Sequence, residues 1–224
     1  MGSQFQFIKF FNSLNKNDAL VAGGKGASLG EMTKAGIPVP PGFVVTAQAF
    51  DYFITKTDID VEIDSVLHSV NNQDISTVEG ASEKIKAMIL NQKMPEDITS
   101  EIESSFKLLD SKFVAVRSSA TAEDGAEHAW AGQLESYLNV TEESVLDKVK
   151  HCWASLFTPR AIFYRFEKFG KETHLQKISV AVVVQKMVES EKSGIAFSVH
   201  PVTEDYNQLI IEAGLGLGEA IVSG

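Results

Sequence analysis

The segment Gly23-Gly24-Lys25-Gly26 brings three glycines together with one lysine. Glycines allow backbone N–H groups to approach an anion closely, and the helix predicted to follow presents its electropositive N-terminus to the same place. Lys25 adds a mobile cation, so the segment is a candidate phosphate-binding turn. It is not a P-loop, because Ala19-Leu20 stand where the first glycine of GxxxxGK[ST] belongs and Gly26 replaces the Ser or Thr. A tight turn with a solvated lysine is the alternative interpretation.

Arg117 is the second candidate, because it follows an apolar run that predicts a buried strand. Side chains alternate along a strand, so Arg117 shares one face with Phe113 and Ala115 and stands at the carboxyl end of the strand. Ligands commonly bind beyond this end of the strands in α/β sheets, and a guanidinium is suited to bidentate recognition of phosphate. A structural salt bridge to Glu123, Asp124 or another acid is the alternative interpretation.

A polar cluster precedes a strand that is predicted over residues 137–140. It consists of Gly132, Gln133, Glu135 and Ser136. The cluster ends a loop of small, glycine and acidic residues that begins near residue 118, so it is a third candidate for contact with a ligand. Ordinary capping bonds in a hairpin connection are the alternative interpretation.

Gln185 lies near the end of another predicted strand and shares a face with Ala181 and Val183. Its amide is therefore partly buried and needs a hydrogen-bond partner. The following segment, Lys186-Met187-Val188, indicates a linker between sheets, where exposed backbone groups could read the edge of an adenine ring and Met187 could pack against the ring. An ordinary connection between strands is again the alternative.

The composition is that of a folded, acidic protein. The chain has 224 residues, of which 44% are hydrophobic, and 20 Lys+Arg against 30 Asp+Glu give a formal net charge of -10. This charge disfavours a nucleic-acid partner, and no apolar run approaches the ~18 residues of a membrane span. The single cysteine, Cys152, cannot form an internal disulfide, and the five histidines lack the spacing of a zinc site. We expect a cytoplasmic protein with no nucleic-acid or membrane partner, and we assign none of its residues as a metal ligand.

The candidate residues must be positioned by a mixture of helices and strands. Apolar spacing predicts a glycine turn that runs into a helix ending near Ala35, with Gly36 at its C-terminal cap. The region 58–110 is predicted to be helical and carries no chemical constellation. Other helices are expected over 47–54, 142–157 and 160–169, and strands over 43–45, 113–119, 137–140, 178–184, 194–199 and 208–212. The pattern predicts an α+β fold of helices packed on strands, followed by a hairpin-rich segment.

Taken in order along the chain, several blocks resemble one family. The blocks are VAGGKGASLGEM at 21–32, PPGF at 40–43, VRSSATAED at 116–124, AGQ at 131–133, WASLF at 153–157, VVQKMV at 183–188 and GLGEA at 216–220. Together they resemble the N-terminal region of phosphoenolpyruvate synthase and pyruvate phosphate dikinase. The blocks cover nearly the whole chain in the order in which that family has them.

The resemblance implies an ATP-grasp-like nucleotide-binding domain in which ATP lies between two α+β lobes. The first lobe is then expected over residues 1–177, with the hinge and the start of the second lobe over 178–224. Lys25 and Arg117 are implied to contact the phosphates and to carry the electrostatic part of catalysis.

The same resemblance implies roles for the other polar candidates. Gly132 and Ser136 are expected in the loop over the phosphates, Gln185 beside the adenine, and Lys186, Met187 and Val188 in the hinge that contacts the base. One departure concerns the loop 125–130, where Trp130 stands in place of the usual Phe and an expected proline and serine are missing.

The resemblance also implies a reaction and partners. ATP phosphorylates a histidine on a separate phosphohistidine domain, and an acceptor domain passes the phosphoryl group to pyruvate. The Mg²⁺ ligands of the family are expected beyond residue 224, so we expect a fragment that is inactive alone. A rifampicin phosphotransferase-like enzyme and a stand-alone, non-catalytic ATP-binding module are the alternatives.

Overall fold

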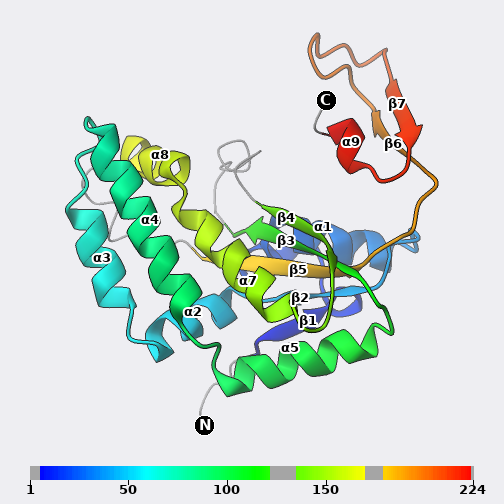
Figure 1. The fold of residues 1–224 in the computed structure, drawn as a ribbon. Coiled ribbons are helices and arrows are strands. Elements are labelled where there is room, and N and C mark those ends of the chain that lie inside the picture. Colours follow the sequence, from blue (N-terminus) through cyan, green and yellow to red (C-terminus); the bar gives the residue numbers. More distant parts are fainter. Residues whose placement is uncertain (1–5, 122–134, 170–178, 223–224) are drawn as a thin grey trace. The chain divides into compact units, whose positions relative to one another are not determined.

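The computed structural model describes residues 6–121, 135–169 and 179–222, and the chain divides into two compact units, Met1–Met187 and Val188–Gly224 (Figure 1). The mixture of helices and strands confirms the predicted α+β class. The first unit continues past residue 177, the expected end of the first lobe, as far as Met187. The reason is that the strand after residue 178 is an inner strand of the first unit's sheet.

The first unit is built on a five-stranded antiparallel sheet with the order β1-β2-β5-β3-β4. Its strands are β1 (Ile8–Phe10), β2 (Gly42–Val45), β3 (Val114–Ala120), β4 (Ser136–Val140) and β5 (Val180–Lys186). The central strand β5 is rich in valine, and Val180–Val184 are buried, as expected for a strand that is covered on both faces of the sheet. Its two edges pair with β2 and β3. The sheet therefore joins segments that lie far apart in the sequence.

One face of the sheet is covered by α1 (Ala19–Lys34). The small core under this helix is formed by Phe11, Leu14, Ala22, Val44, Ala181 and Val183. Two short 3-10 helices, η1 (Phe11–Ser13) and η2 (Lys16–Asp18), lead into α1. Because small residues of α1 meet the sheet, the helix backbone approaches the strands closely.

The other face of the sheet carries the main core and most of the helices (Figure 1). These helices are α2 (Ala47–Lys56), α3 (Asp60–His68), α4 (Ile75–Asn91), α5 (Glu96–Leu108), α7 (Val145–Ala154), η3 (Ser155–Phe157) and α8 (Pro159–Phe169). The region 58–110 is helical as predicted, and it is divided into α3, α4 and α5. The helix α7 packs on β3 and β5, and α4 packs on α7 and α8.

The second unit contains a two-stranded antiparallel ribbon of β6 (Lys192–Phe197) and β7 (Ile210–Leu215), followed by α9 (Glu219–Val222). Both strands had been predicted, but each is displaced by two or more residues from the expected bounds. The strand β7 continues through Gly214 to Leu215, beyond the expected end at residue 212. None of the helices in the described parts of the chain is both long enough and apolar enough to cross a membrane.

The centre of the main core is Trp153, which is fully buried and lies against the rings of Phe50 and Phe53 at centroid distances of 5.8 and 4.9 Å. Trp153→Ala removes this ring and leaves a cavity, so the free energy of unfolding is expected to fall by about 3–5 kcal/mol. Urea unfolding followed by circular dichroism measures the change. The control is Leu108→Ala, whose side chain is 74% exposed. A Trp153→Ala loss no larger than that of the control would contradict this account of the core.

Candidate functional site

The glycine-rich turn predicted from the sequence is a kink within α1. Gly23 has φ 68° and ψ 169°, which is not helical, so α1 consists of a short first segment before Gly23 and a longer second segment after it. A side chain is strained at this φ, which explains the glycine. Lys25 and Gly26 lie in the first turn of the second segment, where backbone N–H groups carry partial positive charge. Lys25 itself is exposed.

Ser119 of β3 holds the kink against the sheet. Its Oγ donates a hydrogen bond to the carbonyl oxygen of Ala22 at 3.0 Å and accepts one from the N–H of Gly26 at 3.3 Å. The contact is so close that a Cβ on Gly23 would stand 2.2 Å from Ser119 Oγ and 2.3 Å from the Ser119 carbonyl oxygen. The turn that bears Lys25 is therefore fixed to β3.

Arg117 lies two residues before Ser119 in β3, so both side chains are on the face that α1 covers. Its neighbours across the sheet are Ser136 of β4 and Val183 of β5. The predicted orientation of Arg117 is confirmed, because Val183 belongs to the small core under α1. Its predicted place at the end of the strand is wrong, since β3 continues to Ala120 by pairing with β5.

The alternative interpretation of Arg117 was a structural salt bridge. None of the carboxylates in the described ranges forms an ion pair with Arg117, whose side chain is half-buried. Glu123 and Asp124, the two acids named in that interpretation, lie outside the described residues. Among the carboxylates that the structure describes, none therefore neutralises the guanidinium.

Cys152 lies in α7, among the buried side chains of the main core. Burial raises the pKa of the Cys152 thiol strongly, Glu135 raises it further, and the positive charge of Lys25 and the N–H of Ser118 lower it. Cys152 is buried in the core, so it is a packing residue.

The hydrogen-bond partner expected for Gln185 is found in the first unit. Its Nε2 donates to the carbonyl oxygen of Pro40 at 3.1 Å, and the amide is half-buried. The next two backbone N–H groups are also used: Lys186 donates to Pro41 at 2.9 Å and Met187 donates to Phe113 at 3.1 Å. Any recognition of a base by this segment must then use groups other than these N–H groups.

The remaining candidates are only partly described. Ser136 begins β4 and is exposed, directly across the sheet from Arg117. Gly132 lies outside the described residues. Val188 is 55% exposed and is the first residue of the second unit. In the parts of the chain that the structure describes, no three His, Cys, Asp or Glu side chains gather to hold a metal ion.

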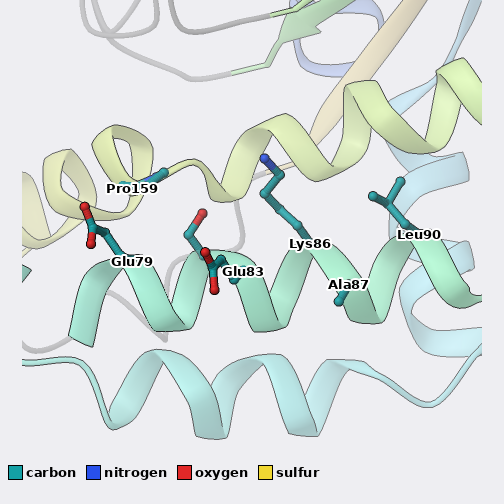
Figure 2. Close-up of a pocket in the computed structure, with 7 residues that line it drawn as sticks. Glu79, Glu83, Lys86, Ala87, Leu90 and Pro159 are labelled. Carbon is teal, nitrogen blue, oxygen red and sulfur yellow. The ribbon is translucent and has the colours of Figure 1, made fainter. Parts of the chain in front are cut away.

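A groove that the sequence analysis did not find lies on the helical side of the first unit (Figure 2). It has a volume of about 670 Å³ and is lined by Glu79, Ser82, Glu83, Lys86, Ala87 and Leu90 of α4 and by Pro159 of α8. Two carboxylates against one lysine make it unsuited to a triphosphate. The surface of a helix has no motif of its own, so only the packing of α4 against α8 could reveal this groove.

Comparison with known proteins connects this geometry to a family. Residues 19–224 match the family described as pyruvate phosphate dikinase, AMP/ATP-binding domain. The chain belongs to this family. The match begins at the first residue of α1 and includes Lys25, Ser119, Arg117 and Gln185 within one AMP/ATP-binding domain.

Curated relatives of this AMP/ATP-binding domain come from several archaea. A probable phosphoenolpyruvate synthase of Archaeoglobus fulgidus is 51% identical over 223 residues, covering 97% of this chain and 29% of the relative. One from Methanothermobacter thermautotrophicus is 47% identical and covers 98% and 32%. The phosphoenolpyruvate synthase of Pyrococcus furiosus is 42% identical and covers 98% and 31%. The chain thus spans about a third of the length of these relatives.

The fit between Gly23 and Ser119 can be tested separately from the strain of a positive φ. Gly23→Ala is expected to lower the free energy of unfolding by more than about 2 kcal/mol, because the new Cβ overlaps Ser119. Gly36→Ala is the matched control: Gly36 also has a positive φ, of 78°, but nothing lies within 4 Å of the added Cβ. Its cost is expected to be about 1 kcal/mol. Equal losses in urea unfolding would show that the contact with Ser119 does not constrain the turn.

Proposed function

We propose that the chain is the ATP-binding part of a phosphoenolpyruvate synthase-like phosphotransferase. The observation that carries the proposal is the tie between the Lys25 turn and β3, which keeps two cations on one face of the sheet in a domain of an AMP/ATP-binding family. Lys25 and Arg117 bind the phosphates of ATP. Gln185 and the segment Lys186-Met187-Val188 lie on the side of the adenine, with Gly132 and Ser136 near the phosphates.

The chemical contribution of these residues is electrostatic. A triphosphate carries several negative charges, and phosphoryl transfer is accelerated when fixed cations hold it in line and offset the charge that develops. Arg117 is suited to this role because its guanidinium presents a planar set of N–H donors from a rigid strand. Lys25 supplies a compact charge from the kinked helix.

Mg²⁺ supplies further charge neutralisation in such a reaction when it is bound. The described residues bring no set of carboxylates together that fits it. We therefore expect its ligands in other parts of a longer enzyme, as the length of the relatives suggests. An ATP-grasp-like domain of two lobes belongs to the same proposal, and the unit that begins at Val188 is the start of the second lobe.

In the whole enzyme, ATP and water react so that a histidine on another domain is phosphorylated and AMP and phosphate are released, and pyruvate then receives the phosphoryl group from the histidine. The names of the relatives support pyruvate as the acceptor. A rifampicin phosphotransferase-like enzyme shares this nucleotide domain and differs in its acceptor domain, while a stand-alone ATP-binding module lacks both later steps.

The phosphate site can be tested by titrating the chain with ATP and Mg²⁺ in a calorimeter. Arg117→Ala and Lys25→Ala are each expected to weaken binding by about 10- to 100-fold, since a charge-assisted hydrogen bond contributes roughly 1.5–3 kcal/mol. Lys86→Ala is the matched control, because it removes the same charge from the groove on α4. If Lys86→Ala weakened ATP binding and Arg117→Ala left it unchanged, ATP would bind in the groove on α4, and the proposal would be wrong.

A further inference from the structure

The hydroxyl of Ser119, in β3, forms hydrogen bonds on both sides of the Gly23 kink in α1, the helix that bears Lys25. On one side of the Gly23 kink it accepts the N–H of Gly26, which opens the second helical segment. On the other side it donates to the carbonyl oxygen of Ala22, which closes the first segment. One hydroxyl therefore caps two helix ends at once, and it does so from a strand 93 residues away in the sequence from Gly26.

Only a group that is both donor and acceptor can make these two bonds. Ala22, Gly26 and Ser119 are all buried, so their polar groups have no access to bulk water. Loss of the hydroxyl leaves a buried carbonyl and a buried N–H without this partner, and both are costly to leave unpaired. In a variant without the hydroxyl, movement of the kink away from β3 would relieve that cost by letting water reach both groups.

We propose that Ser119 is a positioning residue for the triphosphate. It holds the Lys25 turn in register with Arg117, two residues before it on the same face of β3, so that both cations meet one set of phosphates. The proposal rests on the proposed function, because it takes Lys25 and Arg117 as phosphate ligands. Ser119 itself touches no phosphate in this account.

The proposal predicts that the effect of Ser119 appears in the phosphate-dependent part of binding. ATP meets both cations and depends on their spacing, whereas adenosine meets neither. Ser119→Ala is expected to weaken ATP binding by about tenfold or more, as the loss of one charge-assisted contact does, and adenosine binding by less than about twofold. A purely structural role would weaken both ligands in the same proportion.

Ser82 provides the matched control. Its side chain is 2% exposed, and its Oγ donates to the carbonyl oxygen of Phe157 at 2.6 Å. Ser82→Ala therefore also removes a buried hydroxyl bonded to a backbone carbonyl, but from α4 on the opposite side of the sheet. It is expected to lower stability without changing the ratio of ATP to adenosine affinity.

The experiment measures ATP and adenosine affinities by calorimetry for the 224-residue chain and its Ser119→Ala, Ser119→Cys and Ser82→Ala variants. The Cys variant preserves the shape of the side chain with a weaker hydrogen-bonding group, so it tests the proposal even if the Ala variant does not fold. ATP affinity falling in the order Ser, Cys, Ala with adenosine affinity unchanged supports the proposal. Unchanged ATP affinity, or an equal loss for both ligands, overturns it alone. Failure of the unsubstituted, folded chain to bind ATP overturns the proposed function together with it.

Discussion

The structure depends on the contact between the Gly23 kink of α1 and Ser119 of β3. The kink lets the helix turn within van der Waals contact of the strand, and the Ser119 hydroxyl completes the hydrogen bonds that the kink interrupts. A side chain at residue 23 or the loss of the hydroxyl would separate the two elements. Because Lys25 is on one element and Arg117 is on the other, this contact determines whether their charges act on the same ligand.

The proposed site gives an acidic protein a local region that suits an anionic ligand. The chain has a formal net charge of -10, and the groove on α4 is lined by two carboxylates and one lysine. The α1 face of the sheet differs, because Arg117 has no ion-pair partner among the described carboxylates and Lys25 lies in the turn that Ser119 fixes to β3. Salt screens the interaction between exposed charges that lie farther apart than a Debye length of about 8–10 Å. The distant carboxylates of the surface therefore repel a bound anion only weakly, while cations beside the anion attract it strongly.

Much of the site could be predicted because it depends on local rules. The alternation of side chains along a strand correctly assigned Arg117 to the face of Ala115 and Gln185 to that of Val183, and glycine spacing located the kink before the second segment of α1. The rest depends on contacts between distant segments. Whether β3 ends at Arg117 or at Ala120, and whether β5 belongs to the first or the second unit, is decided by pairing between these two strands.

Ser119 illustrates the same limit. Its hydroxyl has no local partner that a sequence pattern would indicate, and its role follows only when β3 lies beside Ala22 and Gly26. The partner of Gln185 is likewise the carbonyl of Pro40, 145 residues away. Residues with polar side chains in buried strands were recognisable as needing partners, but the identity of each partner required the sheet order.

The central claim, that ATP binds on the α1 face of the first unit, is tested most directly by hydrogen exchange with and without ATP and Mg²⁺. When ATP and Mg²⁺ are added, we expect slower exchange in peptides from the start of α1, from β3 around Arg117 and Ser119, and from the end of β5. The peptide that contains Glu79 to Leu90 of α4 is expected to exchange at an unchanged rate. Slower exchange confined to that α4 peptide, or no change anywhere in a folded chain, would contradict it.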